Sequence, residues 1–371
     1  MILLIISVLL FTAYALLVLY YWYAWSQIPL FESKETGTDI HFSIIIPARN
    51  EASNIGALLT ALRRQSYPAN LYEVIVVDDH STDQTVSVVS GFPEVKCICL
   101  QEEGINSYKK KAIETGIAAS NGNWILTTDA DTLPGPDWLQ QIASFAKANQ
   151  AVMVAAPVYM QHNHSILQLF QSMDFMILQA ITGAVVYRKQ LSMCNGANLA
   201  YSVNAYKAVN GFEGIDTIAS GDDMLLMYKI WKQYPNGVHY LKSKAATVST
   251  LPQTSWKSFF QQRIRWASKA GKYEDKRFMP VLLLVYLFNL AFAVLLVAGF
   301  FSPVYFIVGM GLWLGKTIVE FPLFLSAARF FGMGSTSKWF FLFQPLHIIY
   351  TVLSGLFGQA GQYEWKGRKV Q

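Results

Sequence analysis

Cysteine and charge are both scarce in this chain of 371 residues. Its three cysteines match neither a disulfide framework nor a metal-ligand spacing, and Cys97-x-Cys99 lies in an apolar run typical of a strand in a reducing compartment. Charged residues make up 14% of the chain and apolar residues 53%, which is the apolar, low-charge side of ordinary soluble composition. The net charge of +5 is mild, and the basic residues form no stripe interleaved with aromatic residues, so nothing indicates nucleic-acid binding.

Long linkers, low-complexity tracts and internal repeats are missing too, and the apolar excess is concentrated near the two ends. Residues 2–25 contain no charged residue. About 20 helical residues cross the ~30 Å hydrocarbon core of a bilayer, so this stretch is long enough to span it. It has no basic leader and no small-residue cleavage site, and it ends in an aromatic belt from Tyr20 to Trp25. These features favour an uncleaved anchor over residues 1–26 rather than a cleaved signal peptide.

Three more apolar stretches follow residue 278. Residues 279–301 are uncharged, and residues 303–324 contain Lys316 and Glu320, which are four apart and can pair on one helix face. Residues 339–361 are broken by a proline, a histidine and several glycines. The sequence therefore predicts a C-terminal cluster of transmembrane or interfacial helices, although the two charges leave open whether the middle stretch is a clean span.

Basic residues crowd just before the second span and set the expected orientation: they are Arg263, Arg265, Lys269, Lys272, Lys276 and Arg277. Since a Lys/Arg excess marks the cytoplasmic side, we predict an integral protein of the inner or plasma membrane whose soluble domain, residues 40–275, is cytoplasmic. The tail, residues 362–371, is basic and predicted to be cytoplasmic as well. Three full crossings after residue 278 would place that tail outside, so residues 339–361 are predicted to be re-entrant or interfacial.

Strands and helices alternate through the soluble domain. Apolar runs predict strands over 41–47, 72–77, 95–100 and 124–128, and helical spacing predicts helices over 53–65, from Ser81 or Thr82 to Val89, and over 109–119. This alternation is typical of an α/β fold with a largely parallel sheet and right-handed crossovers. Ligands of such sheets bind outside the carboxyl ends of the strands, where the acidic residues of this domain gather.

Two acidic pairs follow predicted strands directly. Asp129-x-Asp131 comes after the fourth strand, and Mg²⁺ or Mn²⁺ prefers such carboxylate oxygens together with substrate phosphates. An isolated pair of this kind is more often a turn or a cap, but its place at a strand end favours the metal. Asp78-Asp79 follows the second strand, where it could accept hydrogen bonds from a nucleobase or ribose, or form a turn and cap the next helix.

A third acidic pair and a Gln-Arg-Trp cluster complete the series. Asp222-Asp223 precedes an amphipathic helix, so it is either a helix start that gains from the helix dipole or the source of a general base. Gln262, Arg265 and Trp266 lie just before the second span. Arginine can clamp a diphosphate and tryptophan offers a flat face to a sugar or lipid, but both also suit a membrane-interface anchor.

Together these residues resemble the family-2 glycosyltransferases of the GT-A fold, with membrane anchoring. The resemblance covers roughly residues 41–270 and rests on seven ordered segments: IIIPARNEASNI, VVDDHSTDQT, KKKAIETGI, TTDADT, GANLAY, GDDMLL and QRIRW. Each segment alone is weak evidence, whereas their order and spacing are specific. The resemblance implies a nucleotide-diphospho-sugar donor and an inverting transfer without a covalent glycosyl-enzyme intermediate.

The family pattern also implies roles for matching positions. Ala48, Glu51 and Asp79 would hold the nucleotide, Lys109 would lie near its phosphates, Asp129 and Asp131 would bind the diphosphate with Mg²⁺ or Mn²⁺, Asp223 beside Asp222 would be the catalytic base, and Gln262, Arg265 and Trp266 would border the acceptor and the diphosphate. Two residues depart from the family pattern, at positions that concern acceptor binding and the nucleotide loop. Ser202 stands where many relatives have arginine, and His80 where glycine is commoner.

The acceptor follows from the membrane segments. A processive polysaccharide synthase passes its polymer through a pore of several helices, and two or three C-terminal segments make a poor pore. We therefore expect one sugar to be added to a hydroxyl of a membrane lipid. A processive synthase is the main alternative, and a non-catalytic membrane protein that binds nucleotide sugars is the minor one.

Overall fold

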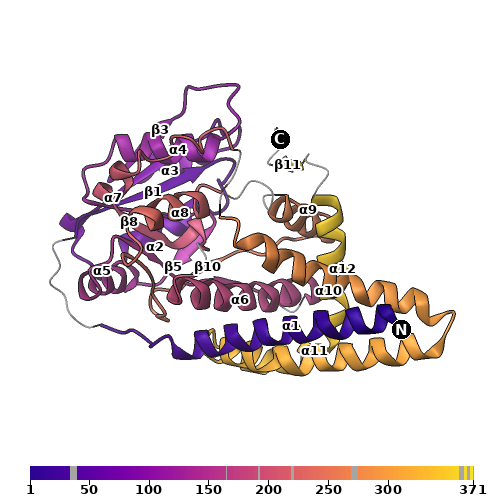
Figure 1. Cartoon of the computed structure of the whole chain (residues 1–371). Coiled ribbons are helices and arrows are strands. Elements are labelled where there is room, and N and C mark those ends of the chain that lie inside the picture. The colour runs from indigo at the N-terminus through magenta and orange to yellow at the C-terminus, as the bar shows by residue number, and fades with distance from the viewer. Residues whose placement is uncertain are drawn as a thin grey trace. The chain divides into compact units, whose positions relative to one another are not determined.

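A computed structural model describes residues 1–33, 40–163, 165–190, 193–218, 221–268, 275–358, 363–365 and 368–370. The chain forms two compact units. One, called the sheet unit here, comprises residues 28–161, 185–251 and 364–371, and the other, the helical unit, comprises residues 1–27, 162–184 and 252–363. The helical unit is thus built from three separate parts of the sequence (Figure 1).

The sheet unit contains a seven-stranded sheet in the order β3-β2-β1-β4-β8-β6-β9. Its strands are β1 (Phe42–Ala48), β2 (Tyr72–Asp78), β3 (Val95–Cys99), β4 (Trp124–Thr127), β6 (Met153–Ala155), β8 (Leu199–Ser202) and β9 (Val238–Tyr240). Neighbours are parallel except that β8 runs antiparallel to β4 and β6. The four strands predicted from apolar runs are confirmed as β1 to β4.

Two smaller sheets and several helices complete this part of the chain. A three-stranded sheet contains β5 (Thr132–Pro134), β10 (Val248–Thr250) and β7 (Val158–Met160), and a two-stranded sheet contains β11 (Tyr363–Trp365) and β12 (Arg368–Val370). The helices are α2 (Ile55–Arg63), η1 (Ala69–Leu71), α3 (Thr85–Ser90), α4 (Tyr108–Ala118), α5 (Trp138–Ala148), η2 (Gly196–Asn198), α7 (Val203–Ala208) and α8 (Met224–Gln233).

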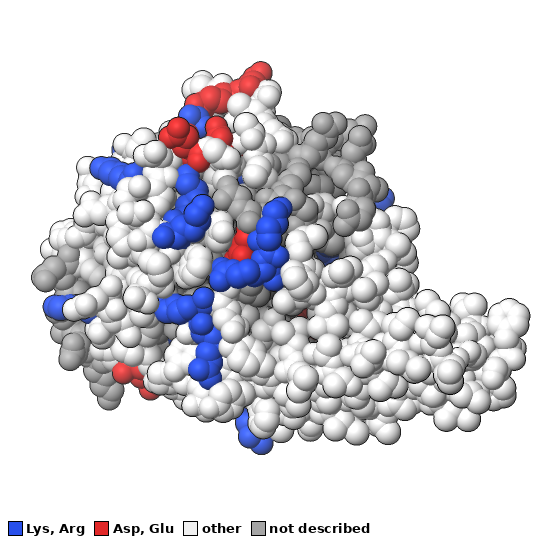
Figure 2. All heavy atoms as spheres, in the orientation of Figure 1, with Lys and Arg blue, Asp and Glu red and all other residues white. Residues whose placement is uncertain are grey.

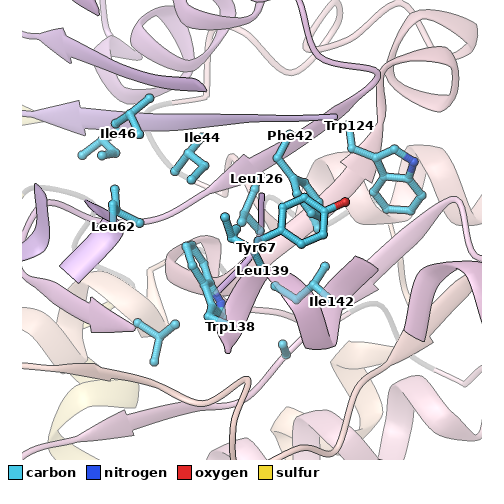
Figure 3. Close-up of a cluster of buried hydrophobic side chains, with 14 of the residues drawn as sticks. Phe42, Ile44, Ile46, Leu62, Tyr67, Trp124, Leu126, Trp138, Leu139 and Ile142 are labelled. Atoms are coloured by element: carbon cyan, nitrogen blue, oxygen red, sulfur yellow. The ribbon is translucent and has the colours of Figure 1, made fainter. Parts of the chain in front are cut away.

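The main core lies on one face of the seven-stranded sheet (Figure 3). Ile44 and Ile46 of β1 and Leu126 of β4 are fully buried there with Trp138 and Leu139 of α5. Successive strand residues point to opposite faces, so Ile45 faces the other side. There α4 approaches β1 so closely at Gly116 that a Cβ would lie 2.6 Å from Ile45 Cγ2. The two helix layers hold the strand ends, and with them the candidate site, in place.

Five helices of the described residues are long and apolar enough to cross a membrane. Four lie in the predicted apolar stretches: α1 (Ile2–Gln27), α10 (Phe278–Gly299), α11 (Pro303–Phe330), and the segment that joins η4 (Gly334–Trp339) to α12 (Phe340–Gly358). On the face shown in Figure 2, the surface over α1, α10 and α11 is almost entirely uncharged. The apolar helices thus indicate association with a membrane.

The fifth long apolar helix, α6 (Ile166–Tyr187), was not anticipated, because it lies inside the span predicted as soluble. Within its most apolar window 78% of the residues are buried inside the protein, against 17–28% for the other four helices. Residues 166–184 of α6 belong to the helical unit, which also contains α9 (Trp256–Ala267). The apolar character of α6 therefore serves packing within the protein.

The two charges of the third apolar stretch pair as predicted. Lys316 Nζ lies 2.7 Å from Glu320 Oε1 and donates to Gln344 Oε1 of α12 at 2.6 Å, while Tyr14 of α1 donates to Glu320. The pair therefore joins three helices, and α11 runs unbroken past it. Helix α12 is likewise continuous through Pro345. Whether residues 339–361 are re-entrant or interfacial stays a prediction. The number of crossings stays a prediction.

Candidate active site

The loops after β1 and β2 are held together by hydrogen bonds at the carboxyl edge of the sheet. Asp79 N donates to Ala48 O at 2.8 Å, and Glu51 N donates to Thr85 Oγ1 at 2.8 Å. Asn50 N donates to Ser81 Oγ at 2.9 Å. The structure thereby brings Ala48, Glu51 and Asp79, the predicted nucleotide-binding residues, into two adjoining loops.

Ser81 lies in this junction and does not begin a helix. Helix α3 begins at Thr85 after Gln84, and Thr82 N donates to Asn50 Oδ1 at 2.8 Å. The predicted start at Ser81 or Thr82 is therefore wrong. The polar groups of these residues bond to the loop after β1, a contact that short-range spacing does not contain.

The two carboxylates of the first acidic pair differ in their surroundings. Asp78 Oδ2 accepts from Ser81 N at 3.0 Å, which is the turn expected as the structural alternative. Asp79 Oδ1 lies 3.0 Å from His80 Nδ1 and 3.9 Å from the Arg49 guanidinium. His80 has φ +54°, a left-handed conformation that glycine adopts more easily than other residues. Both residues are buried, with 3% of their surface exposed, so the structure does not favour one of the two for a ligand.

A second cluster of charges joins three elements at the same edge. Lys109 Nζ, near the start of α4, lies 2.8 Å from Asp129 Oδ1 and 3.4 Å from Asp222 Oδ2. Asp129 follows β4 and Asp222 precedes α8, so residues up to 113 positions apart in sequence meet. Burial alone lowers the pKa of Lys109, but the charges of Asp129 and Asp222 outweigh it and raise that pKa well above the ordinary lysine value. Lys109 therefore stays positively charged.

Asp223 is held rigidly beside this cluster. Its Oδ1 accepts from Met224 N at 2.7 Å, which makes it the N-cap of α8, and its Oδ2 accepts from Gly196 N at 3.0 Å. The helix-start interpretation of this residue is therefore confirmed. Capping also fixes where the carboxylate points, so the structural role is compatible with a chemical one.

Gly196 is a site residue that the sequence analysis did not single out. A Cβ at this position would lie 3.1 Å from Asp222 Oδ2 and 3.5 Å from Lys109 Nζ. The loop that carries Gly196 is tied to β4 because Thr127 Oγ1 donates to Gly196 O at 2.9 Å. Its segment, GANLAY, contributed to the family resemblance, and that was the only available signal. A side chain at this position would therefore require Asp222 to shift by a few tenths of an ångström.

We expect Gly196→Ala to lower turnover by roughly tenfold, since displacing catalytic groups by about 1 Å can cost up to 10²-fold. Gly135→Ala is the matched control, because a Cβ there meets its nearest atom, Ala245 O, at an ordinary 3.7 Å. Initial rates and thermal unfolding of both variants give the comparison. Equal rates for the two variants would contradict a role for Gly196 in the spacing of the charges.

The donor chemistry at Asp129 and Asp131 suits a divalent metal shared with a substrate. No group of three or more His, Cys, Asp or Glu side chains at metal-binding distances occurs among the described residues. Mg²⁺ and Mn²⁺ commonly use only one or two carboxylates, however, with water and substrate phosphates as further ligands. Lys109 Nζ lies 2.8 Å from Asp129 Oδ1, so a metal bound through that oxygen would have to displace the ammonium. The residues fit a metal that a diphosphate helps to hold.

Gln262, Arg265 and Trp266 lie together on α9 of the helical unit. This helix begins with a capping box in which Ser255 and Ser258 bond each other's backbone N–H groups. Arg263, next in the chain to Gln262, is buried, with 3% of its surface exposed. Whether the predicted acceptor and diphosphate contacts form stays a prediction.

Residues 43–209 match the model of the family described as Glycosyl transferase family 2. The matched span begins in β1 and includes Lys109, Asp129 and Gly196, three of the residues that form the charged cluster. These residues form a family-2 glycosyltransferase domain. The family resemblance of the sequence is thereby confirmed.

The glycosyltransferase domain has a solved structural counterpart in the mannosyltransferase PcManGT from Pyrobaculum calidifontis, solved in complex with GDP-Man and Mn²⁺. The two chains superpose with a TM-score of 0.57 at 20% sequence identity, over 95% of this chain and 99% of that chain. At this identity the likeness concerns the fold alone. It confirms the predicted GT-A architecture.

Curated relatives match parts of the chain. Probable glycosyltransferase YdaM of Bacillus subtilis is 25% identical over 64% of this chain and 56% of its own length. A poly-beta-1,6-N-acetyl-D-glucosamine synthase of Staphylococcus epidermidis is 22% identical over 65% and 57%. The dolichyl-phosphate beta-glucosyltransferase ALG5C of Trichomonas vaginalis is 25% identical over 39% and 48%. The chain spans about half the length of these relatives, whose acceptors include both a polysaccharide and a lipid phosphate.

Proposed function

We propose that the protein is an inverting, metal-dependent glycosyltransferase that moves one sugar from a nucleotide-diphosphate sugar to a hydroxyl of a membrane lipid. The observation that carries this proposal is the cluster in which Lys109 lies between Asp129 and Asp222 while Asp223 is fixed alongside. A family-2 domain supplies the class of reaction. The cluster supplies the groups that such a reaction needs.

In the proposed reaction, Asp223 takes the proton of the acceptor hydroxyl as its oxygen bonds to the anomeric carbon. The bond from that carbon to the diphosphate breaks at the same time, and its electron pair leaves with the nucleotide. One displacement inverts the anomeric configuration. Lys109 provides fixed positive charge for the departing diphosphate, and Asp222 keeps that ammonium in place at 3.4 Å.

Donor binding is assigned to the remaining predicted residues. Ala48, Glu51 and Asp79 would hold the nucleoside in the joined loops after β1 and β2. Asp129 and Asp131 would hold Mg²⁺ or Mn²⁺ together with the diphosphate, and the metal would supply Lewis-acid stabilisation of its charge. Chelation with EDTA is part of the proposal's test, because added Mn²⁺ should restore the lost turnover.

The number of exposed apolar helices favours a lipid over a growing polymer as the acceptor. Of the five long apolar helices, α6 is largely buried inside the protein, which leaves α1, α10, α11 and α12 to face a bilayer. Four helices make a poor pore for a polysaccharide. Lys276 and Arg277 precede α10 and support a cytoplasmic catalytic domain at the inner or plasma membrane. Lys269, Lys272 and Lys366 lie outside the described residues.

Mass spectrometry of lipids tests the proposal directly. We expect cells that express the wild type to contain a lipid heavier by one sugar that is missing from cells that express Asp223→Asn. The added mass identifies the sugar, and the rest of the molecule identifies the acceptor. A ladder of chain lengths would instead establish a polysaccharide synthase. Nucleotide-sugar binding without turnover on any lipid would favour the non-catalytic alternative.

A further inference from the structure

A buried ion pair lies inside the helical unit beside the Gln-Arg-Trp cluster. Arg263 of α9 donates through Nη2 to Asp174 Oδ2 of α6 at 2.7 Å, and the two side chains are 3% and 4% exposed. The hydroxyl of Tyr350 on α12 donates to the other carboxylate oxygen, Asp174 Oδ1, at 2.6 Å. One carboxylate thus joins α6, α9 and α12, which come from two of the three parts of the sequence that build this unit.

Arg263 also touches two of the predicted acceptor-site residues. Its Nη1 lies 3.4 Å from Gln262 Oε1, at the long end of hydrogen bonding, and its guanidinium carbon lies 4.3 Å from the centroid of the Trp266 ring. By its place in the sequence, Arg263 is one of the basic residues before the second span that set the expected membrane orientation. In the structure its charge is buried and faces α6.

The chemistry of arginine explains how one side chain can do this. A planar guanidinium forms directed hydrogen bonds at its edge while its face stacks on an aromatic ring. Burying the charge is costly, and removing one partner leaves the other uncompensated. The pair therefore permits only orientations of α9 in which Arg263 reaches Asp174, which fixes the neighbouring side chains of Gln262 and Trp266.

We propose that Asp174, Arg263 and Tyr350 are positioning residues that hold α9 in the orientation in which Gln262 and Trp266 serve sugar transfer. This inference rests on the proposed function and adds three residues that touch no reacting atom. It requires that the buried charges matter for turnover beyond their effect on folding.

A double variant separates positioning from stability. Asp174→Asn alone leaves the buried charge of Arg263 without its carboxylate partner. We therefore expect this variant to have a lower thermal unfolding temperature. Asp174→Asn with Arg263→Met removes both charges and should restore that temperature while leaving kcat about 10²-fold low, with the donor KM within about twofold. The full chain in lipid nanodiscs is assayed by nucleoside diphosphate release from UDP-glucose, UDP-N-acetylglucosamine and GDP-mannose, with host lipid extract as acceptor.

Another buried ion pair provides the matched control. Lys316→Met with Glu320→Gln removes a pair that lies in the same unit and forms none of these contacts. We expect its kcat to stay within about twofold of the wild type. A similar loss in both double variants, or full activity in the Asp174/Arg263 double variant, would overturn the proposal.

Hydrogen exchange gives a readout that needs no substrate. Amides of α9 should exchange faster in the Asp174/Arg263 double variant than in the wild type at equal unfolding temperature, and unchanged exchange would overturn the inference. If the wild type releases no nucleotide with any donor, the proposed function fails, and the exchange experiment still decides whether this pair orders α9.

Discussion

Asp223→Asn is expected to lower turnover by about 10²–10⁴-fold, the usual contribution of a general base, while the protein stays folded. Asparagine caps helices as well as aspartate does, so the N-cap of α8 that Asp223 forms with Met224 N should persist. The amide cannot take up the proton of an acceptor hydroxyl. The amide has a single acceptor oxygen, so it cannot accept from both Met224 N and Gly196 N as the carboxylate does. Thermal unfolding measures the cost of the lost bond separately from the loss of turnover.

Asp137→Asn is the matched control for this prediction. Asp137 is the N-cap residue of α5 and accepts a hydrogen bond from Ser66 Oγ at 2.8 Å, outside the charged cluster. Initial rates, together with thermal unfolding of both variants, give the comparison. If folded Asp223→Asn turned over as fast as Asp137→Asn, Asp223 would not be the base.

Lys109→Met should lower kcat by about 10²–10³-fold, the scale for losing one group that stabilises developing negative charge. The substitution keeps the length of the side chain but removes the ammonium that rests on Asp129 and Asp222. Lys111→Met is the control, since Lys111 lies on the same helix but pairs with Glu102 and Glu114. We expect that control to retain nearly full activity.

The pH dependence of the Lys109 effect follows from its raised pKa. A lysine whose pKa is higher in the folded than in the unfolded protein stabilises the fold below its ordinary pKa, and this stabilisation is lost only as pH rises through the higher, folded value. Lys109 therefore keeps its proton from neutral to mildly alkaline pH. The ratio of wild-type turnover to Lys109→Met turnover should be constant across that range. A ratio that declined across this range would show that Lys109 titrates there.

Local pattern was enough to predict β1 to β4 and the residues at their ends. These strands are mostly apolar, with Glu73 in β2 and Lys96 in β3 as charged exceptions, and their parallel order places the acidic residues at one edge. The remaining strands of the main sheet, β6, β8 and β9, have only three or four residues each, too few for a periodic signal. Their pairing depends on contacts between distant segments.

The contacts that sequence reasoning missed are likewise non-local. Ser81 bonds to Asn50, 31 residues away, and so does not start a helix. Gly196 matters because Asp222 and Lys109 converge on it, and Arg263 matters because Asp174, 89 positions earlier, pairs with it. No spacing rule within a short window contains these partners.

The order of the helical unit along the chain has a consequence for biosynthesis. Tyr14 bonds to Glu320, 306 residues later, and all of the sheet unit except residues 364–371 is encoded in between. At translation rates of about 5–20 residues per second, α1 emerges roughly 15–60 s before its polar partner exists. Helix α10, whose Phe288 ring packs against Tyr14 with centroids 4.6 Å apart, is made shortly before that partner, so α1 has neither of these contacts for most of the interval. A ribosome stalled before α11 would therefore leave a membrane-tethered sheet unit whose helical unit is unfinished.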